Sequence, residues 1–188
     1  YCDGFKKRSL DKAKKHICDN CLEDRIQTRL SDGLEKLSAN EADIITICGM
    51  GGRLIADIVT KGMNVITQNT TLIVSPQSEV GDFRHFLVSQ RLVVDDEKML
   101  KEDGKYYFII KCRKSDENVY SEYSDQYGCK LLENKDKTLY EYLIKEKETN
   151  DGISNSLKKD ESNPTVKLRL QQLSQKNNII MDALSYYD

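Results

Sequence analysis

The sequence has 188 residues, of which 38% are hydrophobic and 32% charged, with a net charge of −2. This length and balance predict one packed domain with an appendage and a heavily charged surface. They exclude a membrane-spanning protein, because no apolar run approaches the roughly 18 residues that cross a bilayer. The basic start around Lys6 has charges where a signal peptide has its apolar stretch, so we expect a cytoplasmic protein.

The first third of the chain predicts a helix, a short strand and a turn. Ser9 can cap a helix from Leu10 to about Cys21, with Leu10, Ala13 and Ile17 on one stripe. Residues 26–30 alternate apolar and polar side chains, as a short strand does. Turn chemistry follows at residues 31–33, and residues 33–37 predict one helical turn.

The middle of the chain alternates strands and helices. Residues 43–48 are almost continuously apolar and β-branched, which is typical of a strand buried on both faces. After a Gly-Met-Gly-Gly turn at residues 49–52, the pattern predicts a helix to about Gly62, a strand over 71–74 and a helix over 80–90. Two further strands, 92–100 and 105–111, flank an Asp-Gly pair that favours a hairpin. This order indicates an α/β fold with a mostly parallel sheet closed by an antiparallel hairpin.

From Ser115 the composition shifts to polar and charged residues and strand patterns fade. We expect a short helix over 120–127, a helix over 137–148, a polar loop over 150–163 and a last helix that starts at Pro164. We therefore divide the chain into a sheet domain, residues 1–114, and a helical domain, residues 115–188. This helical hairpin could simply pack on the sheet domain or could be an arm that docks RNA, and the pattern leaves both open.

Three predicted strand ends carry residues suited to a ligand, since open α/β sheets bind ligands beyond the carboxyl ends of their strands. Asp3 and Asp32 are carboxylates that could accept from ribose hydroxyls and an adenine amino group. The glycines of the 49–52 turn let backbone approach a flat ring or a sulfonium. Taken singly, an aspartate at a strand end is more often a helix cap or a turn former.

Other site classes fit the sequence poorly. The glycine turn is followed by Leu54 where a dinucleotide fingerprint has its third glycine. There is no phosphate-binding loop or nucleophile elbow, and the two histidines lie on predicted helices, which disfavours a His-based triad. Cys18 and Cys21 have metal-like spacing without a second ligand pair, so we expect reduced thiols and no metal.

Five motifs in order resemble the bacterial tRNA (adenine(22)-N1)-methyltransferase family. They lie at residues 31–34 (Ser-Asp-Gly-Leu), 42–55 (through the Gly-Met-Gly-Gly turn), 72–77, 102–107 (Glu-Asp-Gly-Lys-Tyr-Tyr) and 127–132. The block around the glycine turn is the most specific of them. The similarity runs from about Asp3 to the end of the chain.

The resemblance implies a Rossmann-like class I methyltransferase domain, a helical tail similar to a coiled coil, S-adenosylmethionine as cofactor and N1 of adenosine 22 in tRNA as target. We expect a monomer that binds tRNA and neither a metal nor a membrane. The predicted cofactor-binding residues are Asp3, Asp32, Gly33, Cys48 and Gly49. The predicted catalytic residues, the floor between methyl donor and target base, are Gly49, Met50, Gly51 and Gly52. The predicted RNA-binding residues are Lys6, Lys7, Arg8 and Arg53, although a basic run is more often a solvated face.

The start of the chain departs from the family pattern. Family members open with a strand and an acidic glycine-rich loop that embraces the methionine part of the cofactor, whereas this chain begins at Tyr1. We therefore expect a fragment of a longer gene product, with the first strand of its sheet missing. The alternatives are a non-catalytic RNA-binding protein that keeps the fold, a small-molecule methyltransferase and a nicotinamide-dependent oxidoreductase.

Overall fold

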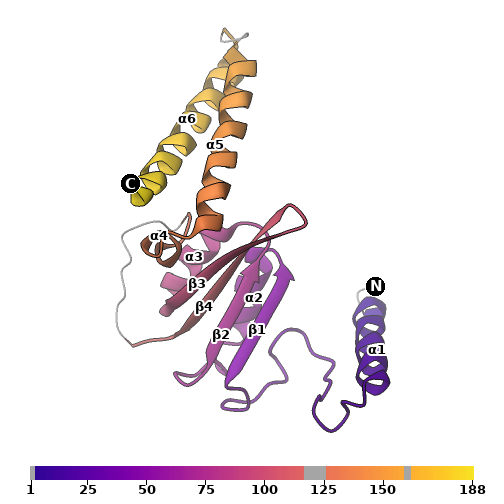
Figure 1. Ribbon diagram of the computed structural model, residues 1–188. Helices are drawn as coiled ribbons and strands as arrows, with labels where there is room; N and C mark the ends of the chain where they lie inside the picture. The colour runs from indigo at the N-terminus through magenta and orange to yellow at the C-terminus, as the bar shows by residue number, and fades with distance from the viewer. Residues whose placement is uncertain (1–2, 117–125, 159–161) are drawn as a thin grey trace.

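The computed structural model describes residues 3–116, 126–158 and 162–188, with side chains from Ser9 onward. Figure 1 shows a twisted sheet with α2 and α3 on one face, a helical tail rising from one end, and α1 standing apart on the side of β1. The elements are α1 (Asp3–Asp19), β1 (Ile44–Met50), α2 (Gly52–Lys61), β2 (Thr71–Pro76), α3 (Val80–Ser89), β3 (Leu92–Glu102), β4 (Lys105–Lys114), α4 (Cys129–Glu133), α5 (Lys137–Leu157), α6 (Pro164–Leu184) and a final 3-10 turn (Ser185–Tyr187).

The strand order is β1-β2-β4-β3. β1 and β2 are parallel, whereas the pairs β2–β4 and β3–β4 are antiparallel. The strands predicted over residues 43–48 and 71–74, both intervening helices and the hairpin are confirmed, but the expected mostly parallel sheet is wrong for the described residues. The hairpin supplies two of the four strands, so the sheet is mixed.

The core of the sheet domain lies between the sheet and the helices α2 and α3. Ile45 and Ile47 alternate with exposed neighbours along β1, so only one face of this strand is buried. On α2 the four-residue spacing of Ile55 and Val59 places both side chains, 0% exposed, against that face. The expectation that the first long strand is buried on both faces is therefore wrong, since Ile44 at its start is 60% exposed.

The helical tail shares a core with the hairpin, because leucines on α4 and α5 and Ile180 of α6 cluster with Met99 of β3 and Phe108 of β4. Asn163 caps α6 and Pro164 stands just inside it, as predicted. The predicted loop over 150–163 is wrong at its start, because α5 continues to Leu157. Asn150 is only 7% exposed, and its side-chain amide donates to Asn177 of α6 at 3.1 Å. A cross-helix partner thus satisfies a polar side chain that the local sequence assigns to a loop.

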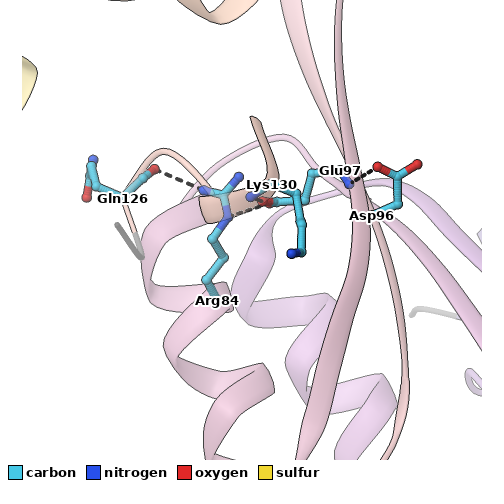
Figure 2. Close-up of polar contacts among 5 residues, drawn as sticks. All are labelled: Arg84, Asp96, Glu97, Gln126 and Lys130. Atoms are coloured by element: carbon cyan, nitrogen blue, oxygen red, sulfur yellow. Dashed lines mark hydrogen bonds and ion pairs between the residues drawn. The ribbon is translucent and has the colours of Figure 1, made fainter. Parts of the chain in front are cut away.

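A buried ion pair ties the tail to the sheet domain (Figure 2). Arg84 of α3 donates from Nε to Glu97 of β3 at 2.8 Å and from Nη1 to the carbonyl of Gln126 at 2.9 Å. The backbone N–H of Lys130, on α4, donates to the other oxygen of Glu97 at 3.3 Å. No sequence pattern predicts this cluster, because partners so far apart along the chain leave no local periodicity.

The N-terminal part differs most from its prediction. α1 begins at Asp3, so Ser9 lies inside the helix and does not cap it. Residues 26–30 form no strand, and no described strand lies beside them to complete a ladder. The helix expected over 120–127 falls mostly outside the described residues. No helix in the described part of the chain is long and apolar enough to span a bilayer.

Candidate functional site

A cavity of about 670 Å³ lies where α1, the segment after it, the end of β1 and α2 meet. We name it the Asp32 cavity. Its size falls within the usual range for small-molecule sites. Its lining residues are Ser9, Leu10, Ala13, Arg29, Leu30, Ser31, Asp32, Gly33, Met50, Leu54, Asp57, Ile58 and Lys61. The structure thus brings three predicted site residues, Asp32, Gly33 and Met50, to one cavity.

Asp32 offers a carboxylate that a ligand can reach. Its Oδ2 lies 3.5 Å from Nζ of Lys61, and the two side chains are 53% and 58% exposed. An ion pair so exposed to water contributes little stability. A ligand donor could therefore replace the Lys61 ammonium at small cost.

Gly33 is fixed by its backbone and by its neighbour on α2. Its φ is +56°, and a Cβ built on it would lie 2.9 Å from Cγ2 of Ile58. Both observations disfavour any side chain at this position. The turn therefore brings its backbone close to α2, beside the carboxylate of Asp32.

The Gly-Met-Gly-Gly turn divides into an open half and a packed half. Gly49 has φ +78° at a bulge in β1, and a Cβ there would meet nothing within 4 Å. Gly52 is buried, and a Cβ on it would lie 2.8 Å from the carbonyl oxygen of Ser78 and 2.9 Å from that of Glu79. Gly49 therefore permits the positive φ of the bulge, whereas Gly52 permits close packing of the start of α2 on the loop after β2.

The other predicted site residues lie outside the cavity lining or outside the described side chains. Cys48 is exposed at the end of β1 and does not line the Asp32 cavity. Arg53 has an 81% exposed side chain, 3.4 Å from the carboxylate of Glu79. Asp3, Lys6, Lys7 and Arg8 lie on α1, but their side chains fall outside the described ones. Their roles therefore stay predictions.

Two charged groups of the cavity, Asp57 and Lys61, are not among the predicted site residues. They lie on α2 with Leu54 and Ile58, and the three- and four-residue spacing of 54, 57, 58 and 61 indicates one face of a helix. Once Leu54 is known to line the cavity, this periodicity in the sequence is enough to predict that Asp57 and Lys61 line it too.

Arg29 is held at the rim of the cavity by Glu41. The guanidinium contacts the carboxylate, and the N–H of Ser38 donates to the other oxygen at 2.9 Å. Arg29 first, and then the N–H of Ser38, lower the pKa of Glu41 to about 2. This pair anchors the irregular segment that carries Asp32.

No group of three or more His, Cys, Asp or Glu side chains that could hold a metal ion occurs among the described residues. The cysteines whose side chains are described are free thiols. Burial raises the pKa of Cys112 to about 12, which keeps this thiol protonated and unreactive at neutral pH.

Comparison with known proteins identifies one family. A family model described as TrmK, tRNA (adenine(22)-N(1))-methyltransferase, matches residues 5–181. The chain is 37% identical over 107 residues to the tRNA (adenine(22)-N(1))-methyltransferase of Bacillus subtilis strain 168. This alignment covers 57% of the chain and only 45% of the relative's own length.

Two solved structures extend the similarity to nearly the whole chain. The crystal structure of the B. subtilis m1A22 tRNA methyltransferase TrmK has a TM-score of 0.78 at 28% identity, covering 93% of this chain and 77% of that one. The structure of M. capricolum TrmK in complex with S-adenosyl-homocysteine has a TM-score of 0.76 at 25% identity, covering 96% and 77%.

Proposed function

Because the chain belongs to the tRNA (adenine(22)-N(1))-methyltransferase family, we propose that it takes part in the S-adenosylmethionine-dependent methylation of N1 of adenosine 22 in tRNA. The observation that carries this proposal is the Asp32 cavity, which joins the predicted adenine-binding turn to the end of β1. We further propose that the protein is a cytoplasmic monomer, and that residues 1–114 and 115–188 are its sheet and helical domains.

The residues of the cavity fit the adenosine end of S-adenosylmethionine. Asp32 is an accessible acceptor for the adenine amino group. Gly33 lets the turn pack closely against Ile58 of α2, and Leu54 and Ile58 supply the apolar part of the cavity lining. A volume of about 670 Å³ is ample for a nucleoside with an extension. When bound, this cofactor supplies an electrophilic methyl group on a sulfonium.

The protein's part in such a transfer is placement. The N1 lone pair of neutral adenine lies in the ring plane and is already nucleophilic, so no side chain has to remove a proton. Orientation alone can lower a barrier by about 7–11 kcal/mol. Met50, which lines the cavity at the end of β1, and the open half of the turn at Gly49 would set the floor across which donor and acceptor face each other.

The RNA partner is supported by exposed basic residues near the site. Arg53 projects from the first turn of α2, next to the glycine turn. We propose that Arg53, together with Lys6, Lys7 and Arg8, contacts tRNA phosphates. The helical tail, similar to a coiled coil, would extend this surface. A base inside folded tRNA has to be unstacked before its N1 can be reached.

Calorimetric titration of the folded chain with S-adenosylmethionine tests the cofactor site. We expect saturable micromolar binding that weakens about tenfold or more in Asp32→Ala, because a hydrogen bond to a charged acceptor is lost. Glu35→Ala, an exposed carboxylate three residues along that does not line the cavity, is the matched control and should bind as wild type. No binding, or equal binding by Asp32→Ala, would contradict the site.

Methylation is tested on a tRNA transcript by primer extension, since a methyl group on N1 blocks the pairing edge of adenine. We expect a stop at position 22 that requires S-adenosylmethionine and disappears when guanosine replaces adenosine 22. RNA binding without any stop would instead support a non-catalytic RNA-binding protein.

A further inference from the structure

A second cavity, of about 330 Å³, lies on the other side of the Gly-Met-Gly-Gly turn from the Asp32 cavity. We name it the Tyr142 cavity. One wall is the loop after β2 and the start of α3, residues 76–82. The rest is aromatic and comes from β4 and the tail, with Gln126 between the two walls; the aromatic residues are Tyr106, Phe108, Tyr127 and Tyr142. Three of the five sequence motifs, at residues 72–77, 102–107 and 127–132, contribute lining residues, but none of them alone predicts a cavity.

The loop of this cavity is hydrogen-bonded directly to the glycine turn. The N–H of Gln77 donates to the carbonyl of Met50 at 2.9 Å, and the N–H of Gly52 donates to the carbonyl of Ser78 at 3.0 Å. A Cβ on Gly51 would lie 2.8 Å from Oγ of Ser78. The hydrogen-bonded turn and loop therefore connect the two cavities, because Met50 lines the Asp32 cavity and Gln77 and Ser78 line the Tyr142 cavity.

The aromatic wall is held rigidly. The ring of Tyr142 meets the rings of Tyr106, Phe108 and Tyr127 edge-on, at centroid distances of 5.1, 5.7 and 6.4 Å. The hydroxyl of Tyr127 donates to Glu146 at 2.8 Å. Behind Phe108, the guanidinium of Arg84 lies 5.2 Å from the ring centroid. Edge-to-face pairs and buried partners leave these rings little freedom, so the wall is formed before any ligand arrives.

The opposite wall is polar and open to solvent. Gln77, Ser78 and Glu79 are exposed, and the amide of Gln77 and the carboxylate of Glu79 can meet the polar edge of a ligand. Basic groups stand beside the aromatic wall, because Nζ of Lys101 and Nζ of Lys145 lie 5.3 and 5.5 Å from the ring centroid of Tyr106. The cavity thus offers an aromatic surface for the flat face of a base, polar groups for the edge of the base, and ammonium groups for a phosphate. Base face, base edge and phosphate are the parts by which a nucleotide is recognised.

We propose that the Tyr142 cavity binds one unstacked adenine of the RNA substrate, with its face toward the aromatic wall and its edge toward residues 77–79. This proposal rests on the proposed function for its substrate class. It adds that the acceptor base enters from the side of the tail, opposite the methyl donor. Tyr106 and Tyr142 are then positioning residues, and the carboxylate of Glu79, which pairs with Arg53 in this structure, would face the positive charge that N1 methylation places on the ring.

Titration of the full chain with adenosine 5′-monophosphate, followed by NMR, tests the cavity without needing the cofactor or methylation. Tyr106→Ala removes a half-buried ring at the wall, and Tyr106→Phe keeps the ring as the matched control. We expect binding to weaken about tenfold in Tyr106→Ala, since base–aromatic stacking of this size is typical, and to be unchanged in Tyr106→Phe. Binding must also survive Asp32→Ala, because the nucleotide could otherwise occupy the Asp32 cavity. Loss in Asp32→Ala, or wild-type binding by Tyr106→Ala, overturns the proposal.

A second measurement uses the wild-type chain and so does not depend on how a variant folds. Photolysis with 8-azidoadenosine 5′-monophosphate should label peptides that contain residues 76–82 or 106–108, and label confined to residues 29–33 or 50–61 overturns the proposal. Binding of S-adenosylmethionine can be absent while this labelling is observed, and the labelling can be absent while S-adenosylmethionine binds. The two results therefore separate failure of the base cavity from failure of the proposed function.

Discussion

The two cavities are neighbours across one turn, but they are built in opposite ways. The Asp32 cavity has walls from α1 and an irregular segment whose side chains are mostly exposed, such as Leu30 at 48%. The Tyr142 cavity is backed by a buried cluster that joins Met99, Phe108, Tyr127 and residues of α4, α5 and α6. Buried packing preorganises a site, whereas exposed loops have to be ordered by the ligand at an entropic cost. On the proposed assignment, the acceptor side is therefore the rigid one, and the donor side is the one that a ligand must order.

The strongest test of this contrast is to remove the buried ion pair behind the Tyr142 cavity. Glu97→Ala leaves the guanidinium of Arg84 without its carboxylate, and breaking a buried pair costs about 3–5 kcal/mol. Urea unfolding should show this loss. The control is Asp95→Ala, whose partner Arg113 is 52% exposed, and which should cost below about 1 kcal/mol. Equal losses in the free energy of unfolding for the two variants would contradict the inference that this junction is the rigid part of the molecule.

A hydrophobic truncation on each side gives the next largest difference. Leu143 of α5 is 0% exposed, so Leu143→Ala should lower the free energy of unfolding by about 2–5 kcal/mol. Leu10 of α1 is only half-buried, and Leu10→Ala should cost less than about 1 kcal/mol. Thermal unfolding of the two variants checks this order. A larger loss from Leu10 would mean that α1 packs in solution more tightly than its exposed stripe indicates.

A glycine substitution sharpens the comparison inside the Asp32 cavity. Gly33→Ala meets both a positive φ and the side chain of Ile58, and backbone strain of this kind costs about 1–3 kcal/mol. Because the segment has little buried surface, the loss should appear as faster amide hydrogen exchange over residues 31–37. Gly104→Ala, at φ +77° with open space around its Cβ, is the matched control for strain without a clash. Unchanged exchange in Gly33→Ala would show that the turn does not depend on this contact.

The smallest expected effect is electrostatic and concerns the Arg29–Glu41 pair at the cavity rim. The pKa of Glu41 falls from its ordinary value of 4.5 to about 2 in the folded protein. A lowered carboxyl pKa adds stability above the unfolded value, and that contribution is lost as the pH falls from about 4.5 through about 2. The difference in melting temperature between wild type and Glu41→Gln should therefore be present at pH 6 and shrink steadily below pH 4.5. A difference that stays constant with pH would contradict the pairing.

Elements with a local residue pattern are predictable from the sequence alone. The apolar β-branched run predicts β1, the Asp-Gly pair predicts the β3–β4 hairpin, and Asn163-Pro164 predicts the start of α6. The ordered motifs around residues 31–34 and 49–52 also indicate the family and three lining residues of the Asp32 cavity, namely Asp32, Gly33 and Met50. Of these, only Met50 lies at the end of a strand, because residues 26–30 form no strand.

Other features depend on contacts between residues far apart in the chain. Residues 26–30 have a strand-like alternation, but no described strand lies beside them to pair with. The local sequence around Asn150 predicts a loop, whereas in the structure Asn150 lies in a helix and its side-chain amide donates to Asn177 of a second helix. The Tyr142 cavity gathers residues from positions 76 to 142, and the Arg84–Glu97 pair connects α3 to β3 and the tail. Hydrogen bonds and packing between residues far apart in the chain carry no local periodicity, so these features exist only once the fold brings their parts together.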